Sequence, residues 1–94
     1  MARIIRLRWN PNNIAHIWRH QVRTNEVQEV VDGDSIVEAG HSERRVFIGP
    51  TVVNRMLAVV LEAEGGDVYF PVTARPASRE ERRRYEEQRG GAEQ

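Results

Sequence analysis

Arginine is the residue type with which this sequence could do chemistry. All fourteen Lys-or-Arg positions are arginine. The planar guanidinium group binds phosphate through two parallel hydrogen bonds, which suits a nucleic-acid partner, although genomic base composition would produce the same bias. Arg75 stands out because it ends an alternating segment and shortly precedes an arginine-rich stretch, residues 79–89. A guanidinium there could stabilise the extra charge of a phosphorane-like transition state.

Four other residues could take part in chemistry on a nucleic acid. Arg44 shares a strand face with Val46 and could bind phosphate. His41 lies in a turn directly before Arg44 and could act as general acid or base, because imidazole titrates near neutral pH. Tyr69 and Tyr85 could stack on a base or carry a proton.

A structural role is the alternative for each of these residues. Arg75 could pair with Glu43 or Glu81 and so orient the last helix. Arg44 could lie along the apolar surface with its charge in solvent. His41 could be an ordinary exposed turn residue. The sequence leaves both interpretations open.

His16 and His20 stand four residues apart, the spacing that puts two imidazoles on one side of a helix. Together with His41 they could form a zinc site. No acidic residue lies between them and no second ligand pair is present, so we expect no metal ion and no other cofactor. We interpret His20 as closing the helix C-terminus, where positive charge is favourable.

Apolar periodicity predicts an α+β fold that positions these residues. We expect a twisted antiparallel sheet of four or five strands, two N-terminal helices on one face and a polar C-terminal helix. Asn10 and Thr24 are expected to cap the two N-terminal helices, and Pro11 to occupy the first helical position. The inward residues of these helices are expected to be Ile14, Ile17, Trp18, Val27, Val30 and Val31. The strands are expected at residues 3–9, 35–39, 44–48, 55–64 and 67–74.

The last strand has features that locate the candidate site. Gly65 and Gly66 suit a tight hairpin that needs positive φ angles. Pro71 cannot donate to a neighbouring strand, so the strand is either unpaired there or bulged. Strict alternation would place one set of side chains in the core beneath the helices and another on the open face of the sheet. The core set is Val68, Phe70, Val72 and Ala74, and the open set is Tyr69, Pro71, Thr73 and Arg75.

The predicted C-terminal helix is polar on nearly every side. Ser78 and Glu81 form a capping-box pattern at its start. Tyr85 is its one candidate anchor to the core. Oppositely charged residues recur at i,i+4, but such pairs stabilise a helix by only about 0.2–0.5 kcal/mol each. Because the helix has many arginines and little apolar surface to pack against the core, we expect it to bind an anionic partner.

Composition indicates one globular domain, residues 1–89, followed by a frayed tail, residues 90–94. The chain has no cysteine, which excludes disulfides and thiolate metal sites. No segment has the length of a membrane span or the pattern of a signal peptide, so a cytoplasmic protein without membrane contact is expected. Residues 1–25 carry five arginines and no acid, and residues 26–43 carry six acids and no arginine, although the whole chain has zero net charge. Such segregation lets a neutral chain present a basic face.

Two stretches resemble the BrnT family of type II toxin–antitoxin toxins, which are small ribonucleases of the RelE/ParE-like class. The first runs from Trp9 to Val22 and is similar to the family's opening aromatic–Asp/Asn turn, helix and basic–His–x–Val exit. The second runs from Ala74 to Glu86 and is similar to the family's Ala-Arg-x-Ala-Thr/Ser-x-x-Glu-Arg-x-x-Tyr ending. Weaker matches lie around His41–Arg44 and Arg55. Together they cover roughly residues 7–87. Pro76 and Arg19 depart from the family pattern, which often has lysine at both positions.

The resemblance implies a metal-independent endoribonuclease. The 2′-hydroxyl of RNA would attack the adjacent phosphate, Arg75 and Arg44 would stabilise the developing charge, and His41 or a tyrosine would move the proton. A ribbon-helix-helix antitoxin is the implied protein partner. The resemblance and the charge pattern together assign RNA or antitoxin binding to a further set of residues, namely Arg55, Tyr69, Arg79, Arg82, Arg83 and Tyr85.

Two other functions remain possible from the sequence. The chain could be a catalytically inactive interaction module of the same fold. Residues 10–31 could also form a helix-turn-helix that reads DNA, but the second helix would offer Glu26, Glu29 and Asp32 to the groove and so repel phosphate. We rank the DNA-reading function last.

Overall fold

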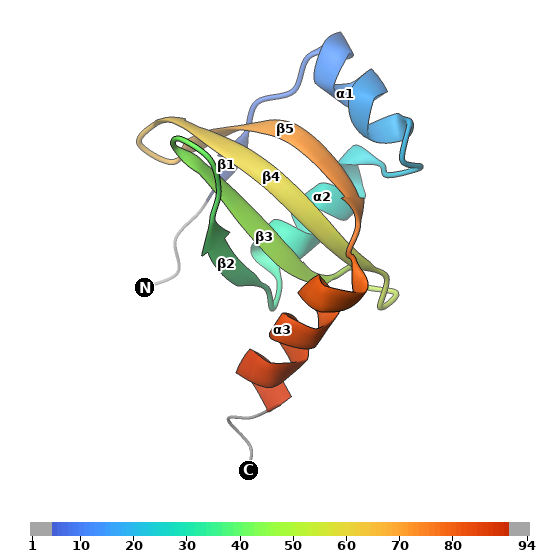
Figure 1. Cartoon of the computed structure of the whole chain (residues 1–94). Coiled ribbons are helices and arrows are strands. Elements are labelled where there is room, and N and C mark those ends of the chain that lie inside the picture. The colour runs from blue at the N-terminus through green and yellow to red at the C-terminus, as the bar shows by residue number, and fades with distance from the viewer. Residues whose placement is uncertain (1–4, 91–94) are drawn as a thin grey trace.

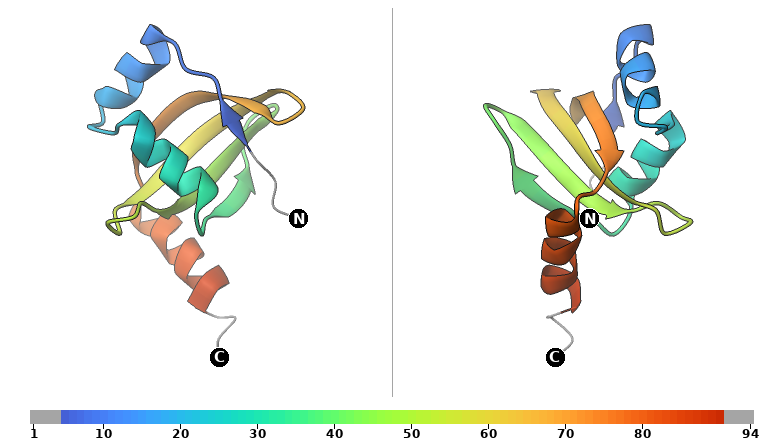
Figure 2. Two further views of the ribbon diagram at one scale, coloured as in Figure 1. Left: turned by 180° about the vertical axis from the view of Figure 1, so that it is seen from behind. Right: turned by 45° about the vertical axis from the view of Figure 1, so that its right-hand side comes forward.

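The computed structural model describes residues 5–90 as a five-stranded sheet with two helices on one face and a third helix at one end of the other (Figure 1). Figure 2 shows α1 and α2 in front of the sheet when the molecule is seen from behind. This is the α+β architecture that the sequence predicts. The elements in chain order are β1 Arg6–Leu7, α1 Pro11–Trp18, α2 Thr24–Asp32, β2 Ile36–Ala39, β3 Arg44–Pro50, β4 Met56–Gly65, β5 Val68–Pro76 and α3 Arg79–Gly90.

The strand order is β1-β5-β4-β3-β2. Strands β2 to β5 are antiparallel neighbours, as expected, but β1 runs parallel to β5 and makes the sheet mixed. The first strand is also shorter than predicted, because only Arg6 and Leu7 pair with β5. Residues 1–4 of the predicted strand lie outside the described residues.

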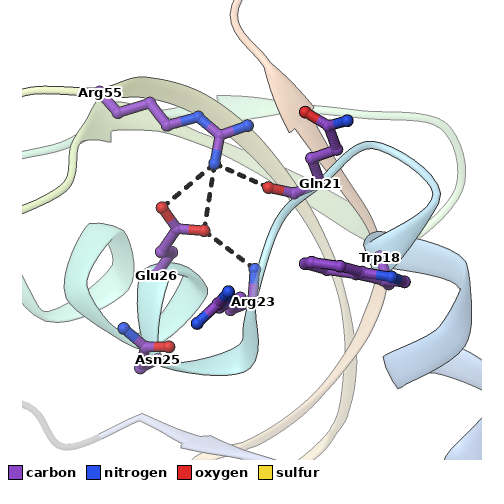
Figure 3. Close-up of a pocket in the computed structure, with 6 residues that line it drawn as sticks. All are labelled: Trp18, Gln21, Arg23, Asn25, Glu26 and Arg55. Carbon is purple, nitrogen blue, oxygen red and sulfur yellow. Dashed lines mark hydrogen bonds and ion pairs between the residues drawn. The ribbon is translucent and has the colours of Figure 1, made fainter.

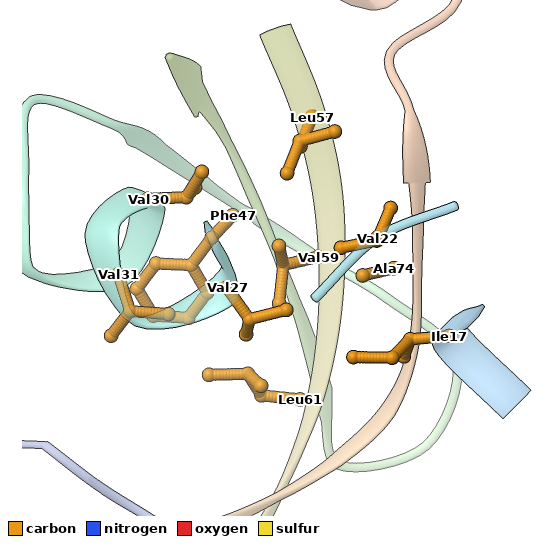
Figure 4. Packing of buried hydrophobic residues seen from close by; sticks show 10 residues of the cluster. All are labelled: Ile17, Val22, Val27, Val30, Val31, Phe47, Leu57, Val59, Leu61 and Ala74. Atoms are coloured by element: carbon orange, nitrogen blue, oxygen red, sulfur yellow. The ribbon is translucent and has the colours of Figure 1, made fainter. Parts of the chain in front are cut away.

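Alternation along β4 divides the buried apolar residues into two clusters. Leu57, Val59 and Leu61 point toward α1 and α2, and Ala58 points to the opposite face. The larger cluster fills the space between the sheet and these helices (Figure 4); it contains Ile17, Val22, Val27, Val30, Val31, Phe47, Leu57, Val59, Leu61 and Ala74. The smaller cluster lies beneath α3 and contains Ile36, Ile48 and Ala58, with Val46, Met56, Ala77 and Tyr85 packed against it.

Helix α1 begins as predicted but faces a different way. Asn10 accepts a hydrogen bond from the backbone N–H of Asn13, and the Asn13 side chain accepts one from the backbone N–H of Asn10. The predicted inward stripe is wrong in two positions, because Ile14 and Trp18 are 42% and 55% exposed. Asn13 is buried instead, and its amide donates to two backbone carbonyls, those of Arg8 and Pro71. These bonds turn Asn13 and Ile17 inward.

The end of α1 is a Schellman turn. The N–H of Val22 bonds to the carbonyl of Ile17, and the N–H of Gln21 bonds to the carbonyl of Trp18. Gln21 therefore adopts φ 60°, a left-handed conformation that favours glycine. The turn also buries Val22 beside Ile17 in the larger cluster.

Helix α2 has Arg23 rather than Thr24 as its N-cap residue. The Glu26 carboxylate accepts the backbone N–H of Arg23, which makes a side-chain cap from Thr24 unnecessary. Val27, Val30 and Val31 are buried, as predicted.

A bulge in β5 changes the predicted face of several residues. Leu61 pairs with Pro71 and Val60 pairs with Thr73, so Val72 is an extra residue. Tyr69 and Pro71 therefore share the helix-covered face with Ala74, and Phe70 turns to the open face. The strict alternation expected for this strand is wrong up to Pro71 and right from Thr73 onward. Proline has no backbone N–H to donate to the neighbouring strand, and the bulge interrupts the regular hydrogen-bond pattern directly after Pro71.

The expected glycines are found before β5, whereas α3 extends further than predicted. Gly65 and Gly66 have φ angles of 122° and 56°; Gly65 ends β4, and Gly66 and Asp67 make the turn to β5. Gly90 closes α3 instead of belonging to the predicted tail, and residues 91–94 lie outside the described residues.

Candidate nucleic-acid interface

The face of the sheet opposite α1 and α2 is the candidate interface. Val60, Thr73 and Phe70 lie on it and are half-buried, and α3 covers only the end near Ile48 (Figure 1). Four arginines surround this open face, and each pairs with a carboxylate; the pairs are Arg8–Glu64, Arg44–Glu62, Arg75–Glu81 and Arg84–Glu38. The open face thus combines half-buried apolar side chains and one aromatic ring, Phe70, with ion pairs around them.

Arg75 is held by the start of α3. Its Nη1 and Nη2 atoms donate to the two carboxylate oxygens of Glu81 at 2.7 and 2.9 Å. Glu81 is only 8% exposed, and it also accepts the backbone N–H of Ser78, while the Ser78 hydroxyl accepts the N–H of Glu81. The hydrogen bond from Arg75 lowers the pKa of Glu81 to about 2. The predicted capping box is confirmed, and the structural alternative for Arg75, a pair with Glu81, is what the structure shows.

Arg44 and His41 lie at the other end of the open face from Arg75. Arg75 is aligned through Ala58 with Ile48, which is four residues along β3 from Arg44. The two positions are two strands apart and four residues apart along the strand direction. With about 4.8 Å between neighbouring strands and about 3.3 Å per residue, the Cα atoms of Arg75 and Arg44 lie about 16 Å apart. His41 stands in the exposed β2–β3 turn, where its carbonyl accepts the N–H of Arg44 at 3.0 Å. The backbones of His41 and Arg44 therefore meet in this turn, whereas Arg75 lies at the other end of the sheet.

Arg8 and Phe70 belong to the open face although the sequence did not single them out. The Arg8 guanidinium lies 5.0 Å from the centre of the Phe70 ring and donates twice to Glu64 at 2.6 Å. The hydrogen bond from Arg8 lowers the pKa of Glu64. Phe70 was missed because the bulge at Val72 reverses its face, and the Arg8–Glu64 pair joins residues 56 positions apart.

Helix α3 is fixed by bonds to the rest of the fold. Arg84 donates twice to Glu38 at 2.7 and 3.1 Å, and the Tyr85 hydroxyl donates to the carbonyl of Asp34 at 2.8 Å. Burial raises the pKa of Tyr85. Arg89 pairs with Asp34 as well. Within residues 5–90, the ion pairs of α3 all join it to residues outside the helix, in place of the expected i,i+4 pairs inside it. Tyr85 anchors the helix to the rest of the fold.

Three arginines remain on the outer side of α3. Arg79, Arg82 and Arg83 are exposed and, with Glu86, line a hollow of about 340 Å³. In the described part of the chain no carboxylate lies within ion-pair distance of these three. They are the α3 residues that an anionic partner could reach without breaking a bond of the fold.

Two predicted binding residues lie away from the open face. Arg55 donates to the carbonyl of Gln21 at 2.8 Å and to both oxygens of Glu26 at 3.1 Å, which ties the β3–β4 loop to the α1–α2 turn (Figure 3). Tyr69 packs against the larger apolar cluster. Neither contact tests a binding role, but neither residue shares a surface with Arg44 or Arg75.

His16 in α1 and His20 in the turn after it have ring centres 6.1 Å apart. Across residues 5–90, no three His, Cys, Asp or Glu side chains gather as metal ligands would. No helix in that range is long and apolar enough to cross a membrane.

Comparison with known proteins adds no family assignment. No protein-family model matches this chain, and no curated protein matches it. The likeness to the BrnT family therefore stays a prediction carried by the residues quoted for it, and the fold is what the structure establishes.

Proposed function

We propose that this chain is the toxin component of a type II toxin–antitoxin system and that it cleaves RNA bound along the open face of the sheet. One observation supports this most strongly. The face opposite α1 and α2 combines apolar and aromatic side chains, Val60 and Phe70, with guanidinium groups at both ends, Arg44 and Arg75. Single-stranded RNA is bound through such a combination of stacking surface and phosphate-binding cations.

The cleavage centre lies at the end of the face that holds Arg44 and His41. The 2′-hydroxyl of RNA attacks the adjacent phosphorus, the bond to the 5′-oxygen breaks, and a 2′,3′-cyclic phosphate remains. His41 moves a proton, and Arg44 stabilises the phosphorane charge. The Cα of Arg75 lies about 16 Å from that of Arg44, and its guanidinium is held at the start of α3 by Glu81, so in this proposal Arg75 binds another part of the same RNA strand.

Expression and cleavage assays test this proposal. Expressed by itself, the chain is expected to arrest growth, and the purified protein to cleave RNA in EDTA, leaving cyclic-phosphate or 3′-phosphate ends. Arg44→Ala should lower cleavage by about two orders of magnitude, typical of losing one transition-state donor. Arg75→Ala should cost only about tenfold, as one lost phosphate contact does. Arg45→Ala is the matched control, since this exposed neighbour points to the other face.

A ribbon-helix-helix antitoxin completes the proposal, with the cytoplasm as its setting. The outer side of α3 offers Arg79, Arg82 and Arg83 to an acidic antitoxin segment without disturbing the fold. Reversing all three charges should abolish capture of a co-expressed antitoxin encoded beside this gene, whereas reversing Arg45 and Arg19 should not. Capture that survives the triple reversal would move the antitoxin to another surface.

An inactive interaction module of the same fold is the second candidate. It is favoured by the pairing of each open-face arginine with a carboxylate, because RNA phosphate must then compete with Glu62 or Glu81 for the guanidinium. A folded, non-toxic protein that leaves RNA intact but still captures a partner would favour this candidate over the ribonuclease.

A further inference from the structure

The α1–α2 side of the molecule carries most of its exposed large apolar residues. Trp18 is 55% exposed at the end of α1, and Val52 and Val53 are 80% and 76% exposed in the β3–β4 loop. Arg55 ties this loop to the α1–α2 turn, and the Val52 N–H donates to Glu29 at 3.1 Å. The apolar side chains are thus held beside α2 by the fold. Solvent-exposed tryptophan in such a setting is typical of protein–protein contact.

Two hollows run along the outer side of α2 and meet at Asn25. One, of about 450 Å³, is lined by Trp18, Gln21, Arg23, Asn25, Glu26 and Arg55 (Figure 3). The other, of about 530 Å³, is lined by Asn25, Gln28, Glu29, Asp32, Gly33 and Val52. Asn25 lines both, so the hollows form one continuous surface with Asn25 at its middle. We call this the α2 surface.

The two halves of the α2 surface carry opposite uncompensated charge. In the first half, the Arg23 guanidinium lies 5.6 Å from the centre of the Trp18 ring, and within residues 5–90 no carboxylate is paired with it. In the second half, Glu29 and Asp32 accept only neutral donors, the amides of Asn25 and Gln28 and the Val52 N–H. On the open face of the sheet, by contrast, Glu38 and Glu81 are each paired with an arginine.

Opposite charges on the two sides of one central residue make a surface self-complementary under two-fold symmetry. A two-fold axis at Asn25 would turn the half with Glu29 and Val52 of each copy toward the half with Arg23 and Trp18 of the other. Interfaces of this isologous type are the commonest in soluble oligomers.

We propose that two copies of this chain form a dimer through the α2 surface, about a two-fold axis at Asn25. The interface joins each Arg23 to the partner copy's Glu29 and covers the exposed Trp18 and Val52 side chains. It leaves the open face of the sheet accessible, because α1 and α2 cover the opposite face (Figure 2). The dimer therefore does not depend on the proposed ribonuclease function.

A cysteine at the axis gives the sharpest test, because the native chain contains no cysteine. Asn25→Cys should oxidise to a covalent dimer at least tenfold faster than Gln88→Cys, a control at another exposed position, on α3. The axis brings the two copies of residue 25 together but separates the two copies of residue 88. Equal rates for the two variants would overturn the proposal.

Charge reversal tests the pairing itself. In sedimentation equilibrium, Arg23→Glu and Glu29→Arg should each raise the dimer dissociation constant at least tenfold, because each places two like-charged contacts in the interface. The double variant R23E/E29R should restore it, since both contacts regain opposite charges. Circular dichroism confirms that each variant is folded. A native chain that is monomeric at millimolar concentration, or a double variant as weak as either single one, would contradict the dimer.

Discussion

On its helix-covered face the sheet packs aliphatic side chains against α1 and α2, whereas on its open face it is crossed by ion pairs. Leu57, Val59 and Leu61 on the first face are fully buried, and the polar group buried there, Asn13, is fully bonded. On the second face Arg75–Glu81 and Arg84–Glu38 hold α3 across the sheet. Hydrophobic burial supplies most of the free energy of folding, and partly exposed ion pairs contribute little. One face therefore holds the fold, and the other can be changed for binding.

The largest effect that tests this contrast comes from a pair of neighbouring residues in β4. Leu61→Ala should lower the free energy of unfolding by about 2–5 kcal/mol, because it leaves a cavity in the larger cluster. Val60→Ala, on the open face and half-buried, should cost less than about 1 kcal/mol, since little buried volume is lost. Urea unfolding of both variants measures the difference. Similar costs for the two would mean that the open face is as much a core as the other.

Asn13→Ala tests the buried amide side chain of α1. It should cost about 2–3 kcal/mol, because it removes a capping bond and leaves the carbonyls of Arg8 and Pro71 without their donor. The matched control is Asn12→Ala, an exposed neighbour in the same helix turn. Thermal unfolding of both variants measures the loss. A similar loss in Asn12→Ala would mean that helix propensity, and not the hydrogen bonds of the Asn13 side chain, is responsible.

The Arg75–Glu81 pair predicts how stability depends on acid. The ordinary pKa of Glu81 is 4.5, and in the fold it is about 2. A carboxyl with a lowered pKa stabilises the fold above its unfolded pKa and loses that contribution as pH falls through the folded one. Between pH 4.5 and 2 the native protein should lose about 1–2 kcal/mol through this group, after allowance for the solvent that screens the partly exposed Arg75.

Glu81→Gln should remove this part of the acid dependence. The variant should be less stable than the native protein at pH 7 and nearly equal to it at pH 2, as measured by urea unfolding across the pH range. Glu80→Gln serves as the control, because this exposed neighbour makes no such bond to Arg75. An unchanged acid profile in Glu81→Gln would show that Arg75 and Glu81 are not paired in solution.

The smallest expected effect is a gain in stability at the end of α1. Gln21→Gly should stabilise the fold by about 0.5–1 kcal/mol, because glycine adopts the left-handed conformation without steric cost. Gln21→Ala keeps a Cβ atom and should show no such gain. A loss of stability in the glycine variant would mean that the Gln21 side chain holds the α1–α2 turn.

Signals between near neighbours in the sequence could be read more often than those that depend on distant contacts, although Thr24 was wrongly expected to cap α2. Ser78 and Glu81 are three residues apart, so their capping box could be predicted from spacing. The orientation of α1 could not, because it depends on an amide bond from Asn13 to Pro71, 58 positions away. That bond leaves Trp18 exposed although its spacing is that of a core residue.

The candidate site shows the same limit. Pro71 indicated a bulge or an unpaired position in β5. Which aromatic residue faces the open side depends on where the bulge lies, and the strand register places it at Val72. Sequence alone chose Tyr69 and missed Phe70. It also grouped Arg75 with Arg44, which the register places at opposite ends of the sheet. Arg8 was missed because its partners Glu64 and Phe70 are distant in sequence.

The central claim is that RNA binds along the open face of the sheet. Nuclear magnetic resonance titration of the labelled protein with a short mixed-sequence single-stranded RNA tests it directly. We predict that the amide signals of Val46, Val60 and Thr73 shift with RNA and that the shifts fade as salt is raised. Signals that shift only in α1 and α2, or that do not shift at all, would contradict the claim.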